Sequence, residues 1–287
     1  MQEYNMDGSS IRRRILWDKL FKIIIILLTS CSILPIFFIL FFITSKGISV
    51  VNWSFFTQLP KPVGELGGGI SNAILGTFIL VGISTAFSVP LGILTGIFLS
   101  EYKKGRFVYF TKLSVETLQG IPSIVIGIIA YVWVVIPMGS FSALSGGVAL
   151  GLMMLPIIVT STDETLKLIP EGLREASLAL GVSYPRTILK VILPAGITGI
   201  LTGILLSIAR VAGETAPLLF TAFGSPFMSL NTLKPINSLP LMIFNYATGP
   251  YPEWHTLAWG ASFVLIVFVL GLNLLTKVVT RRWKVQF

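Results

Sequence analysis

The chain has 287 residues, of which 54% are hydrophobic and only 11% are charged, whereas ordinary soluble domains carry about 25% charged residues. A soluble fold would have to hide several apolar runs of about 20 residues in one core, which a chain of this length hardly allows. The net charge of +9 does not indicate nucleic acid, because the basic residues stand in short runs beside apolar segments without interleaved aromatic residues.

The chain begins with a basic tail over residues 1–19, followed by an apolar run over residues 20–45. Basic residues before an apolar stretch are also typical of a signal peptide. This run is far longer than the apolar region of about 7 to 15 residues in such a peptide, and no small-residue cleavage pattern ends it. We therefore expect it to remain as a first transmembrane helix.

Six apolar stretches are bounded by charged or turn residues and are long enough to cross a bilayer. They cover residues 20–45, 70–100, 112–138, 144–165, 192–222 and 256–279. Four prolines fall inside four different stretches, where neighbouring helices can accommodate them: Pro35, Pro90, Pro122 and Pro156. The second carries small residues suited to close helix packing: Ala73, Gly76, Gly82, Ala86, Gly92 and Gly96. The sequence thus predicts an all-α, polytopic membrane protein in which six transmembrane helices form a packed bundle.

Two connecting segments on one side of the membrane are longer than a turn, over residues 46–69 and 223–255. The first contains GELGGG at 64–69, which we interpret as a turn leading into a helix. It lacks the Lys and Ser or Thr that follow the glycines of a phosphate-binding P-loop. No nucleotide site is visible in the sequence.

Cysteine and histidine give no sign of a metal site. Cys31 is the only cysteine and His255 the only histidine, so an intrachain disulfide or a thiol metal cluster is impossible. With no second His or Cys nearby, an interfacial structural role suits His255 better than metal binding. We expect no cofactor in this chain.

The basic residues predict the orientation of the chain. Of the 21 Lys and Arg residues, all except Lys46, Lys61, Lys234 and the intramembrane Arg210 fall on one side of the six expected spans. Because Lys and Arg accumulate on the cytoplasmic side, both termini, including the tail 280–287, are predicted to be cytoplasmic in a multi-pass protein of the cell membrane.

A short, half-polar helix is expected at about 171–190 on the cytoplasmic side, between the fourth and fifth spans. Residues 171–180 are rich in helix-forming residues, Gly181 can end the helix and Pro185 can begin the next. Small side chains at Ala176, Ser177 and Ala179 would let another surface come close. A plain amphipathic interfacial helix is the simpler alternative.

This segment resembles the cytoplasmic loop of bacterial ABC-import permeases, whose pattern is E-A-A, three residues, Gly, nine residues, then I-x-L-P. The matching residues are Glu175, Ala176, Ser177, Gly181, Val191, Ile192, Leu193 and Pro194. Ser177 replaces the third Ala and Val191 replaces Ile, which are small or isosteric changes.

The resemblance implies the fold of type I ABC-importer permeases (MetI-like), with a five-helix core over 70–279. It also implies that the helix at 171–190 docks on a separate ATPase subunit, through Glu175, Ala176, Ser177, Gly181, Leu193 and Pro194. A rigid helix of this kind can transmit a rigid-body motion to the helices joined to it. Catalysis would then belong to the ATPase, which uses ATP and Mg²⁺, and this chain would not be an enzyme.

The fifth span contains two ionisable residues, Arg210 and Glu214, four residues apart. At that spacing they project from one face of a helix, and charged groups inside a span usually face the bundle interior or a water-filled path. An ion pair that only fixes helix packing is the alternative interpretation.

Four stretches resemble phosphate-import permeases: GELGGGISNAILGT at 64–77, VPLGILTGIFLSEY at 89–102, GIPSIVIGIIA at 120–130 and ARVAGETAPLLFTAFG at 209–224. The resemblance implies a subunit that forms half of a path for inorganic phosphate. Its partners would be a second, related phosphate permease, an ATPase subunit dimer, an external phosphate-binding protein and membrane lipids, with no nucleic acid.

The substrate path is expected at Arg210, Glu214 and Thr215. Arg210 can bind phosphate oxygens, and an ionised Glu214 could accept the phosphate O–H, which sulfate lacks. Glu116 and Gln119, near the cytoplasmic entrance, are as typical of helix-end polar residues as of path residues.

Two other functions stay open. A permease for another oxyanion or solute would keep the helix at 171–190 but would not need the Arg210 and Glu214 pair. An ion-coupled secondary transporter would explain the intramembrane charges, but it predicts inverted repeats and no ATPase-docking helix.

Overall fold

The computed structural model describes residues 8–65 and 67–282, and over these residues all regular secondary structure is helical. Five of the described helices are long and apolar enough to cross a membrane. A sixth span results when the bent pair Arg106–Gly120 and Ser123–Met138 is counted as one crossing. The expected all-α bundle of six spans is therefore confirmed.

The centre of the bundle is the pair formed by α3 (Ser71–Glu101) and α7 (Ala143–Lys167). Missing side chains let the two helices approach closely, since Cβ atoms added at Gly92 and Gly96 would lie 2.7 and 2.5 Å from side-chain atoms of Ile158 and Thr162. The hydroxyl of Ser88 also donates to the carbonyl of Gly151 at 2.8 Å. The α3 side of this pair thus has the small-residue face that the sequence predicts.

Two of the small residues expected on that face do not lie on it. A Cβ atom at Gly82 would meet no atom within 4 Å, and Ala86 is exposed. The buried positions of α3 recur about every fourth residue, at Gly76, Leu80 and Ser84. Gly82 and Ala86 fall between these positions and face outward, so the prediction was wrong for them.

The third expected span, 112–138, is broken rather than continuous. Helix α4 (Arg106–Gly120) is followed by α5 (Ser123–Ala130), a π-helical turn η1 (Tyr131–Val135) and α6 (Ile136–Met138). The two parts of the span meet at 111°. The break lies at Pro122, which lacks an N–H and disfavours helical geometry in the preceding Ile121.

The fifth expected span also differs from the prediction. The chain forms α9 (Tyr184–Thr187), a π-helical stretch η2 (Ile188–Ile192) and α10 (Leu193–Val211) without interruption. It then turns at residues 212–215 and enters the four-residue helix α11 (Ala216–Leu219). Helix α10 therefore ends at Val211 and not at residue 222.

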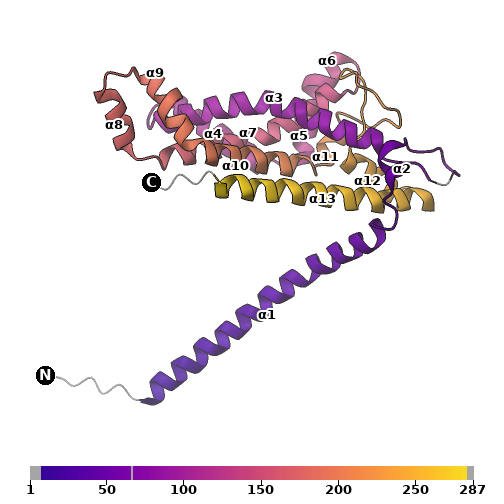
Figure 1. Cartoon of the computed structure of the whole chain (residues 1–287), viewed down its shortest axis with the longest axis horizontal. Coiled ribbons are helices and arrows are strands. Elements are labelled where there is room, and N and C mark those ends of the chain that lie inside the picture. Colours follow the sequence, from indigo (N-terminus) through magenta and orange to yellow (C-terminus); the bar gives the residue numbers. More distant parts are fainter. Residues whose placement is uncertain (1–7, 66, 283–287) are drawn as a thin grey trace.

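Two further helices lie at one end of the body. Helix α2 (Trp53–Thr57) precedes the GELGGG turn, in which Gly64, Gly67 and Gly68 have positive φ angles. Helix α12 (Leu239–Ala247) lies in a segment expected to be a loop. It begins after the capping hydroxyl of Ser238 and has Pro240 in its first turn. Together with α6, these helices lie at the end opposite to α9 (Figure 1).

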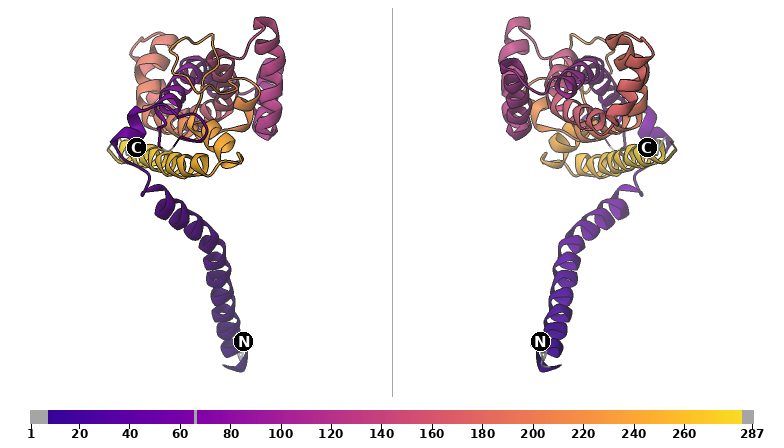
Figure 2. Two further views of the ribbon diagram at one scale, coloured as in Figure 1. Left: turned by 90° about the vertical axis from the view of Figure 1, so that its right-hand side faces the viewer. Right: turned by 90° about the vertical axis from the view of Figure 1, so that its left-hand side faces the viewer.

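The last span is α13 (Pro252–Arg282), which packs along α10 and α12. The first is α1 (Gly8–Gly47), a helix of 40 residues that leaves the body at an angle (Figures 1 and 2). The ring of Phe42 meets Trp259 of α13 edge-on at 5.2 Å, and Gly47 packs on Phe263. Most of α1 is exposed, and its residues 8–19 belong to the expected basic tail, of which residues 1–7 lie outside the described residues.

Candidate functional site

Arg210 lies in the last turn of α10, where its positive charge interacts favourably with the partial negative charge of the helix end. Its Nε atom is 3.7 Å from Oε1 of Glu214. Glu214 is not part of α10 but of the turn that follows, in which the N–H of Gly213 donates to the carbonyl of Arg210. The expected pairing of Arg210 and Glu214 is therefore present, although the two residues do not share a helix.

The guanidinium of Arg210 is only loosely held. Its side chain is 55% exposed, and among the described residues it makes no hydrogen bond beside the ion pair. The 3.7 Å separation is longer than a hydrogen bond. An arginine carries five N–H donors in a planar fork, so the donors of Arg210 stay available to an anion.

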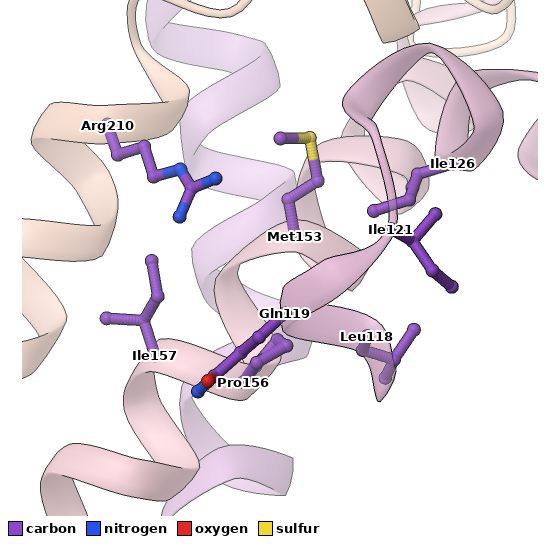
Figure 3. A pocket seen from close by; sticks show the side chains of 8 residues that line it. All are labelled: Leu118, Gln119, Ile121, Ile126, Met153, Pro156, Ile157 and Arg210. Atoms are coloured by element: carbon purple, nitrogen blue, oxygen red, sulfur yellow. The ribbon is translucent and has the colours of Figure 1, made fainter. Parts of the chain in front are cut away.

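A cavity of about 20 Å³ lies beside this guanidinium. It is bounded by the end of α4, the start of α5 and the middle of α7, and Arg210 enters it from α10 (Figure 3). The residues that line it are Leu118, Gln119, Ile121, Ile126, Met153, Pro156, Ile157 and Arg210. Arg210 and Gln119 are the polar residues of this set, and Gln119 is one that the sequence left undecided.

Gln119 and Glu116 differ in their surroundings. The amide Nε2 of Gln119 donates to the hydroxyl of Thr160 on α7 at 2.9 Å. Glu116, one turn earlier, is exposed and lies 3.9 Å from Lys112 of its own helix. The structure therefore separates the two residues, placing Gln119 at the cavity and Glu116 outside it.

Three hydroxyl groups near the ion pair do not line the cavity. Thr215 caps the start of α11, with its carbonyl accepting from the N–H of Leu218. Ser207 and Thr221 are buried and donate to backbone carbonyls of their own helical turns. Of the three predicted path residues, Arg210 and Glu214 are in contact, Arg210 lines the cavity, and Thr215 adjoins the pair.

A second candidate site is the helix α8 (Glu171–Ala179), which lies beyond the ends of the spans (Figure 1). Helix α8 ends at Ala179 and is capped by Leu180. Gly181 follows with a φ angle of +81°, a left-handed conformation that glycine adopts readily. Pro185 lies in the first turn of α9, as its position in the sequence predicts. Leu193 and Pro194 then begin α10, so the predicted helix at 171–190 comprises α8, a turn, α9 and part of η2.

Ser177 points into the chain itself and not toward an approaching surface. It is buried, and its hydroxyl lies 2.9 Å from that of Thr187 on α9. Glu175, Ala176 and Ala179 are exposed. The expectation that Ser177 forms part of a small-residue docking surface was therefore wrong, and its hydroxyl instead connects α8 to α9.

An ion pair that the sequence analysis missed connects α8 to the body. The guanidinium of Arg174 donates two hydrogen bonds to Glu101 at the end of α3, of 2.8 Å from Nη1 and 2.6 Å from Nη2. The hydroxyl of Tyr184 on α9 donates to the same carboxylate. One signal was available, because a negative charge in the last turn of a helix is unfavourable unless it has a partner.

Comparison with known proteins identifies the class and then the family. The fold resembles that of a solved methionine ABC transporter, MetNI, in an inward-facing conformation, with a TM-score of 0.63, 20% identity, and coverage of 74% of this chain and 95% of the other. Residues 88–285 match the family described as binding-protein-dependent transport system inner membrane component. The chain belongs to this family of membrane-spanning transport subunits.

Relatives with higher sequence identity are named for phosphate. The chain is 43% identical over 247 residues to the phosphate transport system permease protein PstA of Yersinia pestis, covering 86% of this chain and 84% of the relative. It is 42% identical over 240 residues to PstA of Haemophilus influenzae, with 83% and 85% covered. A probable PstA of Methanocaldococcus jannaschii is 37% identical over 260 residues, with 90% and 92% covered.

Proposed function

We propose that this chain is the permease subunit of an ATP-driven importer of inorganic phosphate and forms half of the translocation path. The observation that carries the proposal is the position of Arg210. Its guanidinium lies beside a cavity at the middle of α7, on a side chain that is 55% exposed, with its N–H donors largely unused. The relatives named as phosphate permeases identify the anion that such a group would bind.

The chemistry of Arg210 and Glu214 suits phosphate. Arginine forms charge-assisted hydrogen bonds with phosphate oxygens, often two at a time. Near neutral pH, phosphate still carries at least one O–H group, which Glu214 could accept. Sulfate carries no such proton and would be repelled by the carboxylate. We propose Arg210, Glu214 and Thr215 as path residues, with Arg210 as the principal anion contact.

Movement would come from a separate ATPase subunit dimer that binds and hydrolyses ATP with Mg²⁺. Helix α8 is well suited to receive that subunit, since Leu168 before it and Leu180 at its end are 83% and 84% exposed. Apolar side chains exposed to this degree at the end of a bundle are typical of a contact surface. The contacts of α8 with α3 and α9 would carry a displacement of α8 into the spans.

The remaining partners follow from the same proposal. The end of the body with α8 and α9 would face the cytoplasm, because it lies next to most of the basic residues outside the spans. A phosphate-binding protein would deliver the solute at the opposite end. A second, related permease would complete the path, and the exposed α1 is available to pack against it and against the lipids of a bacterial plasma membrane.

The test is phosphate uptake by the assembled complex in sealed vesicles. We expect uptake to require ATP and the binding protein, and to fall to background when Arg210 is replaced by Gln while the complex still assembles. Uptake without an ATPase would support a secondary transporter instead. Uptake of sulfate or molybdate in preference to phosphate would support a permease for another oxyanion.

A further inference from the structure

Gln119 occupies an unusual position in the bundle. It is the last residue but one of α4, three residues before Pro122, where the chain bends by 111°. Its side chain and that of Arg210 line the same cavity from different helices, α4 and α10 (Figure 3). The rest of the lining is apolar. A neutral amide and one cation are thus the polar groups that the lining residues present to this space.

The hydrogen bond to Thr160 orients the amide of Gln119. A glutamine side chain has two N–H donors and one carbonyl acceptor. One N–H is used by the hydroxyl of Thr160 on α7. Among the described residues, the second N–H and the carbonyl of Gln119 have no partner, so the amide offers both a donor and an acceptor at the end of the cavity away from the Arg210 guanidinium (Figure 3).

The cavity is smaller than the proposed solute. About 20 Å³ is enough space for about one water molecule, whereas phosphate has five non-hydrogen atoms. The anion therefore does not fit within this cavity, and it would meet Gln119 and Arg210 from the side on which both residues are exposed. Gln119 is near the bend between α4 and α5, which is a point where two rigid segments of the wall meet.

We propose that Gln119 is a second phosphate contact in the translocation path, acting with Arg210 at this cavity. Its amide N–H donates to a phosphate oxygen, and its carbonyl accepts the phosphate O–H, while Thr160 holds the amide in position. This inference rests on the proposed function and adds a specificity-determining residue to it. It also assigns part of the discrimination between phosphate and sulfate to a neutral group, because a carbonyl can accept a hydrogen bond from the O–H that only phosphate carries.

The test compares Gln119→Leu with Glu116→Gln in the full complex, with uptake of inorganic phosphate and ATP hydrolysis measured together. Loss of one hydrogen bond to a charged group corresponds to about tenfold or more. We expect Gln119→Leu to lower uptake by about that factor while the binding protein still stimulates ATP hydrolysis. Glu116→Gln is the matched control on the same helix, since Glu116 is exposed and outside the cavity, and should leave both rates unchanged.

Competition by other oxyanions separates a solute contact from a packing role. Arsenate has the same shape and protonation as phosphate, whereas sulfate lacks the proton. If Gln119 contacts the solute, Gln119→Leu reduces the preference for phosphate and arsenate over sulfate. If it only packs, the variant changes recovery of the complex but not this preference, and the inference is overturned.

Uptake by the Arg210→Gln variant distinguishes failure of the proposed path from failure of the role of Gln119. If Arg210→Gln abolishes uptake and Gln119→Leu does not lower it, the path is as proposed and the role of Gln119 is wrong. If neither variant changes uptake, the proposed path itself is wrong. Thr160→Val provides a further check, because losing the bond that orients the amide should give a smaller defect in the same direction as Gln119→Leu.

Discussion

Arg174 and Glu101, 73 residues apart in the sequence, form a two-pronged ion pair that joins α8 to the end of α3. The carboxylate is 5% exposed and the guanidinium 23% exposed. Parallel hydrogen bonds of this kind fix the angle between two groups as well as their distance. The pair therefore connects α3 directly to α8, the helix proposed to receive the ATPase. Helix α3 in turn packs along α7 in the centre of the bundle.

Glu101→Gln should weaken the link between ATP hydrolysis and uptake. The change keeps the size of the side chain but leaves Arg174 without its counter-charge, at a cost of about 1 to 3 kcal/mol. We expect fewer phosphate ions imported per ATP hydrolysed, measured in vesicles. Arg174→Lys keeps the charge without the planar fork and should give an intermediate ratio. Glu171→Gln, an exposed change in the first turn of α8, is the control, and an unchanged ratio in Glu101→Gln would contradict a coupling role.

Ser177→Ala should destabilise the protein although it restores the residue of the resembled pattern. Thr187 is 0% exposed, so its hydroxyl would lose its partner, and an unsatisfied buried group costs about 1 to 3 kcal/mol. The double variant Ser177→Ala and Thr187→Val removes both polar groups and should recover much of this loss. Thermal unfolding in detergent measures the effect. Additive losses in the double variant would show that the two hydroxyls do not interact.

Gly76→Ala should prevent normal assembly, whereas Gly82→Ala should be tolerated. A Cβ atom at Gly76 would lie 1.8 Å from the carbonyl oxygen of Asn237, which is backbone and cannot rotate away. Gly82, on the same helix, has nothing within 4 Å, and alanine there should gain up to about 1 kcal/mol of helix propensity. The yield of folded protein after purification measures both effects, and equal yields would exclude tight packing at Gly76.

Glu214→Gln should reduce discrimination against sulfate. The substitution removes the charge that would repel sulfate and places a neutral amide of similar size next to Arg210. We expect sulfate to become a better competitor for phosphate uptake, with the complex still assembled. If the competition is unchanged and only the thermal stability falls, Glu214 serves to hold Arg210 in place and not to recognise the proton.

Hydropathy and local motifs predicted most of the fold for physical reasons. A helix in lipid must satisfy its own backbone hydrogen bonds, so apolar length alone identified the six spans. The turn at Gly181 and the start of α9 at Pro185 depend on neighbouring residues only and were also predicted. The helix α12 was missed because the segment 223–255 was interpreted as a connection between spans, although Pro240 lies in the first turn of the helix, where proline is tolerated.

The candidate sites were predicted less completely, since they depend on contacts between distant segments. Arg210 and Glu214 were found because they are charged residues within an apolar stretch. Nothing local to Gln119 shows that it bonds to Thr160, 41 residues away. Glu101 and Arg174 could not be paired from the sequence for the same reason. The inward direction of Ser177 depends on the position of α9, which brings Thr187 next to it.

The position of α1 has a consequence for biosynthesis. It leaves the ribosome before the other described spans, but the partner within its own chain is α13, the last of them. With 40 residues and a rise of about 1.5 Å each it extends about 60 Å. During translation this rod must remain in the membrane without its intramolecular neighbour, and a subunit made without its companions would leave it exposed to quality-control proteases. Production of the chain should therefore benefit from co-translation with the rest of its complex.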